Sequence, residues 1–546
     1  MGDPRKNRSG GWRARAGRRL GATALAALGS GLIVWAVAGG PAWADTAPAG
    51  AEEPRLRPSD LGPAPRTASA PALRPDTNAL MRRAQEAIAK APTLRGEALP
   101  ASPRSGAVGY AVRDVASGKL LEARDEHALF IPASLTKTPT ALYALTVLGD
   151  GQRYRTSVYG LGPVVDGRLR GDLTLVGSGD PTLDTGDLVD LVKALKALGI
   201  TEVSGQFLYD AAALPTEPQI EPGQPVHAAY NPSISGLNLN FNRVLMRWER
   251  LKDGEYDLNL FAHAQRWSAP AANVLGGLLA PDETGIFRHR RDGDGDESWE
   301  VSSKVLGRKG SRWLPIQGPG RYAAVAFQTV AAELGVTLPA PKTGGVAPGA
   351  KELAAVESEP LREIVRDMLK FSTNLTAEAV GLAASKSRGG GDLSLSSSAA
   401  QMSLWTAQTF QTRAGAMKFV NHSGLTSASR ASPAAMTELL IQARQGDPRF
   451  AKLMPKHRVK GVTGGDVRAK TGTMYYARGL SGFLVCDNGV EVAFTFMHSD
   501  DAKRSELDET MDPESTYVPA AARNWLGRAR RIERGLLGRW SDRYCG

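Results

Sequence analysis

The stretch Pro132-Ala133-Ser134-Leu135-Thr136-Lys137 begins a helix-forming run that continues to Leu145. Ser134 lies in the first turn of this run and Lys137 follows three residues later, so both side chains lie on one face of the helix. A serine hydroxyl is a weak nucleophile until a base removes its proton. A lysine is such a base only if burial and nearby positive charge lower its pKa from about 10.4 toward neutrality. Because S-x-x-K is common by chance, further motifs must support this pair as a nucleophile and its base.

Two later clusters add the remaining chemical groups. Ser372-Thr373-Asn374 lies between two predicted helices, and Lys470-Thr471-Gly472-Thr473 lies on a strand predicted over residues 464–476. Together they supply a second hydroxyl, an amide and a cation, the set of groups needed to relay a proton and to hold a peptide that ends in a carboxylate. A second K-T-G, at Lys342-Thr343-Gly344, occurs in a Pro- and Gly-rich segment before Ser372. We interpret Lys342 as part of a solvated loop.

The order S-x-x-K, S-x-N, K-T-G resembles that of the penicillin-recognising serine peptidases. The local contexts resemble their class C penicillin-binding proteins, the D-alanyl-D-alanine carboxypeptidase/endopeptidase family, over roughly residues 78–500. The matching stretches are Phe130–Ser134, Gly171–Leu183, Tyr230–Leu237, Phe371–Glu378, His422–Leu425 and Arg468–Thr473. The chain departs from the family at Asn421-His422, where Asp-Gly is usual, and the segment 454–465 lacks the expected Asp-Gly-Thr.

The resemblance implies an acyl-enzyme mechanism. Ser134 is expected to attack the carbonyl between two D-alanines, with Lys137 as its base. Ser372 is expected to relay the proton to the leaving amine, and Asn374 to hold the substrate amide. The substrates implied are peptidoglycan stem peptides, with β-lactams as inhibitors.

The resemblance also assigns the third motif. Lys470 is expected to keep the site electropositive, Thr471 to meet the terminal carboxylate, and Gly472 and Thr473 to line the substrate site. The backbone amides of Ser134 and Thr473 are expected to form the oxyanion hole. No cofactor and no metal is expected. The acidic stretch Asp292–Glu297 is not a calcium loop, because Glu297 occupies the position where such a loop needs glycine and Ser303 the position of its bidentate acid. We predict a polar hairpin turn there.

The predicted fold is α+β, with a catalytic domain of antiparallel sheet and helices in two parts, 77–150 and 351–518. The wide interval between Ser134 and Ser372 leaves room for a β-rich insertion over 151–350, which in the family carries a nested smaller domain. Hydrophobic periodicity predicts a first strand over 108–115 and then helices over 361–370, 377–385, 397–411 and 433–445. Strands are predicted over 464–476, 480–486 and 490–497.

The N-terminal segment predicts export. A basic stretch from Arg5 to Arg19 precedes an uncharged run over 20–40 and then Ala42-Trp43-Ala44. We expect an export signal over 1–44 that is cleaved after Ala44, a Pro- and Ala-rich linker over 45–76, and a periplasmic protein. An uncleaved membrane anchor is the alternative. The net charge of +11 is concentrated at the two ends of the chain, which argues against a nucleic-acid-binding face.

The C-terminal segment 519–546 predicts a basic amphipathic helix. Its apolar stripe either packs on the catalytic domain or lies in a membrane surface, so membrane contact through 521–546 is an open alternative. Cys486 and Cys545 are the two cysteines of the chain. Because Cys486 lies in a predicted buried strand, we expect a packed free thiol rather than a bridge.

The motifs thus predict a serine-type D-Ala-D-Ala carboxypeptidase/endopeptidase. A β-lactamase-like hydrolase is the nearest alternative, because it uses the same acylation chemistry. A non-catalytic cell-wall-binding scaffold is the alternative from another class, but a scaffold has no chemical need for Lys137 and Lys470.

Overall fold

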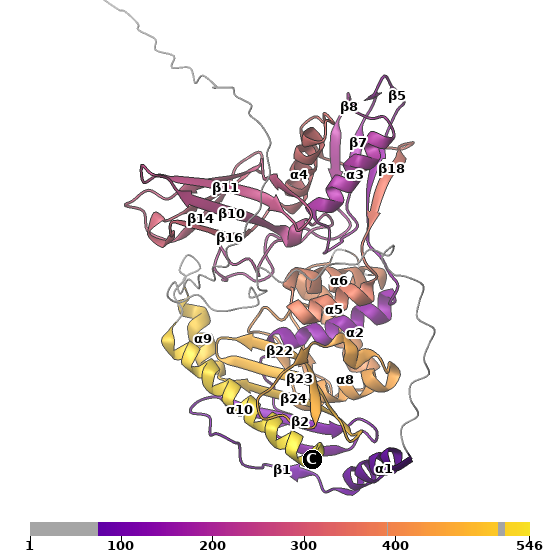
Figure 1. Ribbon diagram of the computed structural model, residues 1–546, viewed down its shortest axis with the longest axis vertical. Helices are drawn as coiled ribbons and strands as arrows, with labels where there is room; N and C mark the ends of the chain where they lie inside the picture. Colours follow the sequence, from indigo (N-terminus) through magenta and orange to yellow (C-terminus); the bar gives the residue numbers. More distant parts are fainter. Residues whose placement is uncertain (1–74, 390, 392, 512–518) are drawn as a thin grey trace, which may run out of the picture. The chain divides into compact units, whose positions relative to one another are not determined.

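The computed structural model describes residues 75–546 except 390, 392 and 512–518 (Figure 1). The predicted export signal over 1–44, its cleavage point and nearly all of the linker lie outside the described residues. Helix α1 (Pro75–Lys90) begins the described part. Within that part, no helix combines the length and apolar character needed to cross a membrane.

A seven-stranded sheet joins segments from before and after the insertion. Its strand order is β1-β3-β2-β24-β23-β22-β21, and every neighbouring pair except β1 and β3 is antiparallel. The strands are β1 (Leu94–Arg95), β2 (Ala107–Asp114), β3 (Leu120–Arg124), β21 (Lys456–His457), β22 (Gly465–Met474), β23 (Ala477–Cys486) and β24 (Glu491–Ser499). The predicted strands over 108–115, 464–476, 480–486 and 490–497 are confirmed as β2, β22, β23 and β24.

One face of this sheet carries a mainly helical layer. The elements are η2 (Ala133–Thr136), α2 (Lys137–Leu148), α5 (Leu361–Phe371), α6 (Asn374–Ser387), α7 (Leu395–Thr409), β19 (Met417–Lys418), β20 (Arg430–Ala431), α8 (Pro433–Gly446) and η5 (Phe450–Leu453). The four helices predicted after residue 351 are confirmed, with ends shifted by at most three residues. Side chains alternate along β23, so Phe483 packs into this layer and Leu484 faces the opposite side.

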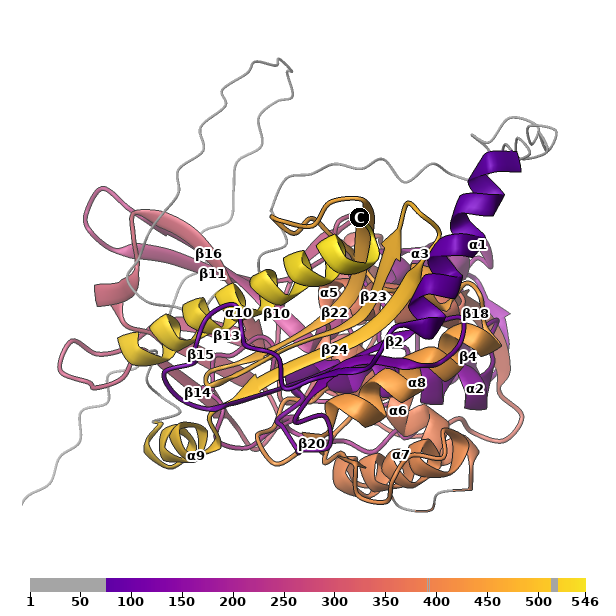
Figure 2. The ribbon, with the colours of Figure 1, turned by 90° about the horizontal axis from the view of Figure 1, so that it is seen from below.

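Helix α10 (Ala520–Tyr544) covers the opposite face of the sheet, while α9 (Asp501–Thr510) follows β24 (Figure 2). The apolar residues of the predicted stripe are all buried: Trp525, Leu526, Ala529, Ile532, Leu536, Leu537 and Trp540. They pack against β22, β23 and β24 and against the residues around Tyr476. The structure therefore supports the closing helix, and the apolar face that an interfacial helix would need is already covered.

The insertion contains separate sheets. A five-stranded sheet has the order β17-β9-β7-β4-β18, and further sheets have the orders β12-β11-β10-β16, β13-β15-β14 and β5-β6-β8. The strands are β4 (Arg155–Gly160), β5 (Val164–Val165), β6 (Arg168–Leu169), β7 (Leu173–Val176), β8 (Glu202–Val203), β9 (Phe207–Asp210), β10 (Arg243–Arg250), β11 (Tyr256–His263), β12 (Ser268–Pro270), β13 (Val274–Leu278), β14 (Phe287–Arg291), β15 (Glu297–Val301), β16 (Lys309–Pro315), β17 (Pro341–Thr343) and β18 (Lys351–Glu357).

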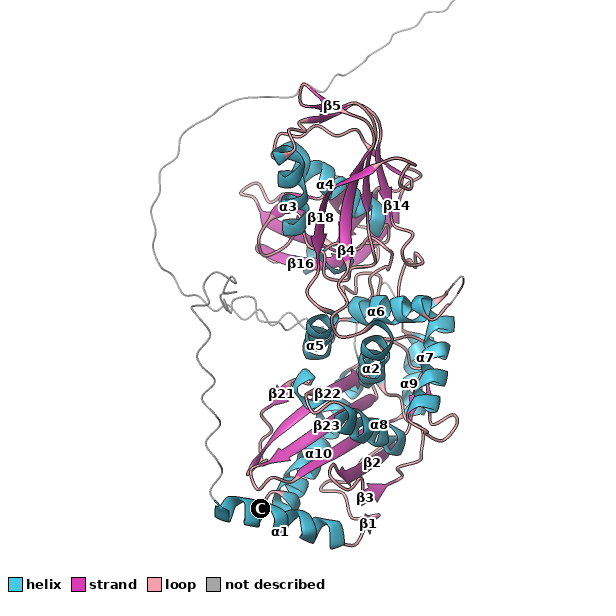
Figure 3. Cartoon of the chain, turned by 90° about the vertical axis from the view of Figure 1, so that its right-hand side faces the viewer, coloured by secondary structure: helices cyan, strands magenta, loops and turns pink. Residues whose placement is uncertain are grey.

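The insertion also contains helices, and one prediction about it needs correction. Besides its strands it contains α3 (Thr185–Ala197) and α4 (Pro319–Glu333), which lie beside the five-stranded sheet, and the short turns η3 (Asn240–Asn242) and η4 (Ser303–Val305) (Figure 3). Lys342 lies on an edge strand, β17, rather than in a loop, although its side chain is exposed as expected. The polar hairpin turn is confirmed, because Asp292 and Asp296 close the connection between β14 and β15.

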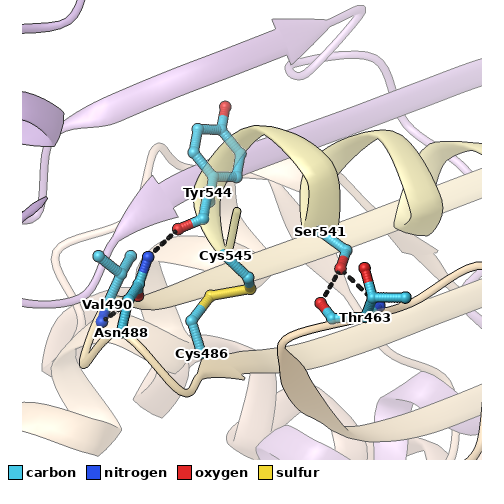
Figure 4. The surroundings of a disulfide bond; sticks show 7 residues. All are labelled: Thr463, Cys486, Asn488, Val490, Ser541, Tyr544 and Cys545. Carbon is cyan, nitrogen blue, oxygen red and sulfur yellow. Dashed lines mark hydrogen bonds between the residues drawn. A yellow bond between two sulfur atoms is a disulfide. The ribbon is translucent and has the colours of Figure 1, made fainter.

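The two cysteines form a disulfide, so the predicted free thiol at Cys486 is wrong. Cys486 ends β23, and Cys545 directly follows α10, with Cα atoms 5.0 Å apart (Figure 4). Strand periodicity correctly placed Cys486 in a buried strand. It could not indicate that α10 ends against that strand, which is the contact that brings the two sulfurs together.

We predict that replacing both cysteines by alanine lowers the free energy of unfolding by about 4 kcal/mol, because the bridge closes a loop between residues 59 positions apart. Urea unfolding of oxidised wild-type and variant protein measures the difference. Reductant should destabilise the wild type to a similar extent and leave the variant unchanged. Equal stability of the two oxidised proteins would contradict the prediction.

Candidate active site

Ser134 lies in η2, a tight turn that rests directly on the sheet. Ala133, which precedes it, has a φ of 46°, in the left-handed region that non-glycine residues rarely adopt. A Cβ at Gly472 would lie 2.4 Å from the carbonyl oxygen of Pro132, and one at Gly479 would lie 2.7 Å from Leu135 Cδ1. Gly472 and Gly479 are paired on β22 and β23. Because neither residue has a side chain, η2 can approach the third motif closely at this pair.

The Lys137 side chain is completely buried and points at three oxygen atoms. Its Nζ lies 2.9 Å from Ser134 Oγ, 2.6 Å from Asn374 Oδ1 and 2.8 Å from the carbonyl oxygen of Ser423. The first and second motifs therefore meet at one amine. Burial lowers the pKa of Lys137 well below its usual value, and the positive charge of Lys470 lowers it further.

Glu378 is a fully buried carboxylate behind this amine. It lies on α6, one turn after Asn374, and accepts hydrogen bonds from the backbone N–H of His422 at 2.9 Å and of Ser423 at 2.8 Å. It thereby fixes the segment whose Ser423 carbonyl meets Lys137. Burial raises the pKa of Glu378, and its negative charge raises that of Lys137, opposing the effect of burial on the lysine.

The unusual Asn421-His422 pair fits into this segment. Asn421 Oδ1 accepts a hydrogen bond from the backbone N–H of Gly424 at 2.8 Å. The buried His422 ring lies 2.7 Å from Ser398 Oγ, and burial lowers its pKa to about 3, so the ring is neutral. The departure from the family pattern therefore introduces no extra charge near Lys137.

Asn374 links the second motif to the insertion. Its Oδ1 accepts from Lys137, and its Nδ2 donates to the carbonyl oxygen of Tyr230 at 2.9 Å. Tyr230 belongs to one of the inserted stretches that resemble the family. An amide has two N–H donors, so Asn374 retains one beyond the bond to Tyr230.

Lys470 joins the third motif to the second. Its Nζ lies 2.9 Å from Ser372 Oγ and 2.8 Å from the carbonyl oxygen of Thr471. Ser372 follows α5 with a φ of 59°, which turns the chain sharply between α5 and α6. Burial, with a contribution from the charge of Arg478, lowers the pKa of Lys470 to about 7.

The third motif lies at an accessible edge of the sheet. Strand β21 pairs only with Val467 and Arg468 of β22, so the edge from Lys470 onward has no strand partner among the described residues. Thr471 and Thr473 are partly exposed and share one face of the strand. Thr473 Oγ1 accepts a hydrogen bond of 2.6 Å from Arg478, which also pairs with Glu533 of α10.

The structure brings the predicted site residues into two contacting groups. The first group consists of Ser134, Lys137 and Asn374. The second group consists of Ser372, Lys470 and Thr471, and it is followed along β22 by Gly472 and Thr473. The close approach of η2 to Gly472 places the groups side by side. Lys342, of the second K-T-G, makes none of these contacts.

Three further residues, Glu378, Arg478 and Glu533, were missed from the sequence. Glu378 carried a signal, because it is an acid within the buried apolar stretch Ala377–Leu382 of a predicted helix. Arg478 and Glu533 carried none, since their importance arises only from the packing of α10 on β23.

The sequence is similar to those of known D-alanyl-D-alanine carboxypeptidases. D-alanyl-D-alanine carboxypeptidase DacB of Haemophilus influenzae is 22% identical over 427 residues, covering 72% of this chain and 85% of that protein. The D-alanyl-D-alanine carboxypeptidase of Actinomadura sp. is 26% identical over 446 residues, covering 72% and 78% respectively.

A solved structure shares the fold. The crystal structure of penicillin binding protein 4 (dacB) from Haemophilus influenzae has a TM-score of 0.62 at 20% identity, covering 81% of this chain and 98% of that chain. The family model described as the D-Ala-D-Ala carboxypeptidase 3 (S13) family matches residues 97–517. Because this match spans most of the sequence, the chain belongs to the D-Ala-D-Ala carboxypeptidase 3 (S13) family of penicillin-recognising serine peptidases.

Proposed function

We propose that the protein is a serine-type D-Ala-D-Ala carboxypeptidase/endopeptidase that acts on peptidoglycan stem peptides through an acyl-enzyme at Ser134. The observation that carries this proposal is the environment of Lys137. Two carbonyl oxygens, from Asn374 and Ser423, lie within hydrogen-bond distance of its amine. A neutral amine has two N–H groups for these acceptors, so its lone pair faces the hydroxyl of Ser134.

This geometry supports the following acylation step. Ser134 Oγ attacks the carbonyl carbon of the penultimate D-alanine while its proton passes to Lys137 Nζ. The backbone N–H groups of Ser134 and Thr473 stabilise the oxyanion. When the C–N bond breaks, Ser372 relays a proton to the departing D-alanine amine, and water later hydrolyses the acyl-enzyme.

Substrate binding uses the second and third motifs. Asn374 offers its remaining N–H to the substrate backbone, and the partly exposed Thr471 meets the terminal carboxylate. Lys470 attracts that carboxylate and supports Ser372, which it contacts. Gly472 keeps the edge of β22 close to η2, so the nucleophile and the carboxylate site remain adjacent.

The proposed location is the periplasm, after export and cleavage behind Ala44. Substrates of this class lie outside the cytoplasm, which supports the export signal predicted over 1–44. Contact of 521–546 with an anionic surface would have to be purely electrostatic and salt-sensitive, because the apolar stripe of α10 is buried.

A non-catalytic scaffold accounts poorly for the two buried lysines. Removing Lys137 and Lys470 from water carries a desolvation cost that a wall-binding surface would not need. A β-lactamase-like hydrolase differs from the proposed peptidase in how quickly its acyl-enzyme is hydrolysed, and that difference can be measured directly.

We predict that a fluorescent penicillin labels the protein covalently at Ser134 and that the label persists, because a β-lactam presents a strained amide beside a carboxylate. Ser134→Ala should abolish labelling, and a pentapeptide ending in D-Ala-D-Ala should lose its last residue by mass spectrometry. Undiminished labelling of Ser134→Ala would refute the nucleophile. Rapid loss of the label with penicillin turnover would favour the β-lactamase.

The two K-T-G sequences provide a matched pair of variants. Lys470→Ala should slow acylation at least about a hundredfold, because it removes a buried charge that contacts Ser372. Lys342→Ala removes an exposed side chain on β17 and should change the rate less than about twofold. Stopped-flow labelling measures both, and equal effects would mean that the third motif has been misplaced.

Glu378→Gln tests how the Lys137 pKa is set. Acylation should rise with pH as Lys137 loses its proton, and the Glu378 carboxylate holds that pKa up. Replacing the carboxylate by a neutral amide should therefore shift the acid limb of the pH–rate profile to lower pH. A limb that stays in place, or moves to higher pH, in a folded variant would contradict this electrostatic link.

A further inference from the structure

Helix α10 reaches the third motif through one buried pair of charged side chains. Glu533, on the face of α10 toward the sheet, accepts two hydrogen bonds from the Arg478 guanidinium, from Nε at 2.7 Å and from Nη2 at 2.8 Å. The third nitrogen of Arg478, Nη1, donates to Thr473 Oγ1 at 2.6 Å. Since Arg478 and Thr473 are paired on β23 and β22, the chain of contacts from α10 to the motif is unbroken.

The chemistry of these groups fixes the role of the Thr473 hydroxyl. A guanidinium donates hydrogen bonds and accepts none, so Thr473 Oγ1 must be the acceptor of the bond from Arg478. The hydroxyl proton of Thr473 then remains available to a bound ligand. A bidentate carboxylate holds the guanidinium plane in one orientation, and Glu533 supplies that carboxylate from a residue only 6% exposed.

We propose that Glu533 and Arg478 are positioning residues of the peptidase site: α10 holds Arg478 so that Thr473 presents its hydroxyl as a donor to the terminal carboxylate of the stem peptide. This inference rests on the proposed function. Arg478 lies on β23, the strand next to β22, and its positive charge adds to that of Lys470. The two side chains are close enough for Arg478 to lower the pKa of Lys470. Both positive charges favour binding of the negatively charged terminal carboxylate of the peptide.

The simpler alternative is that the pair only fastens α10 to the sheet. The same helix provides a control for that role, because Arg539 and Arg543 pair with Glu122 on β3, whose side chain is fully buried. These contacts also attach α10 to the sheet. They involve no residue of the three motifs.

The test compares acylation by a penicillin bearing its free carboxylate with acylation by the methyl ester of the same penicillin. In the wild type the acid should react faster, and the ratio of the two second-order rate constants reports carboxylate recognition. Glu533→Gln should reduce this ratio about tenfold, since a charge-assisted contact loses its fixed geometry. The control Arg539→Gln should keep the wild-type ratio, even where its melting temperature falls.

Two further variants keep the test decisive if Glu533→Gln does not fold. Thr473→Val removes the hydroxyl and leaves both hydrogen bonds between Arg478 and Glu533 in place. Arg478→Lys keeps a positive charge, but its ammonium lacks the planar fork that contacts Glu533 and Thr473 together. Both should lower the ratio. In the double variant Glu533→Gln/Thr473→Val, the ratio should match that of Thr473→Val alone, because both changes remove one shared contact.

The outcomes separate the inference from the proposed function. If the wild type is acylated by neither compound, the proposed function fails. If it is acylated but folded Glu533→Gln or Arg478→Lys keeps the wild-type ratio, or the double variant shows additive losses, the pair is merely a helix anchor and the inference is overturned.

Discussion

A fully buried lysine amine is stable only where protein groups replace the hydrogen bonds to water that it has lost. For Lys137 the replacement comes from three separate segments: η2, the start of α6 and the loop at Ser423. Each of these segments is positioned in turn by a contact with another part of the protein. The glycine pair on β22 and β23 admits η2, Tyr230 of the insertion holds Asn374, and Glu378 holds the Ser423 loop. The position of the Lys137 amine therefore depends on segments from before and after the insertion and on the insertion itself.

The cost of burying several positive charges at the site is offset by buried acids nearby. Lys137 and Lys470 lie close to each other, and Lys470 lies close to Arg478. Two buried acids, Glu378 and Glu533, lie near these cations. Glu378 offsets Lys137, and Glu533 pairs with Arg478. Neither acid lies in the three motifs. The surrounding fold thus supplies an opposite charge to two of the three cations, Lys137 and Arg478.

Local patterns predicted local structure well. The helices after residue 351 and the strands β2, β22, β23 and β24 follow from periodicity. Motif spacing predicted Ser134, Lys137 and Lys470 as site residues, and the structure brings these three close together. Contacts between distant segments escaped prediction. The bridge between Cys486 and Cys545 and the Arg478–Glu533 pair both depend on α10 lying across the sheet, and the stripe of α10 predicted a buried face without indicating its partner. The strand character of β17 was hidden because its pairing with β9 is also a distant contact.

The pairing of β2 with β24 has a consequence for how the chain folds. Ala107 is paired with Ser499, so the central sheet closes only across nearly the whole sequence, with the entire insertion between the partners. Such non-local pairing makes folding slow. Until β24 arrives, β2 presents an open edge and its apolar side chains to other chains. A newly made chain therefore passes through an aggregation-prone stage, and its folding yield should depend on chaperones that shield β2 during that interval.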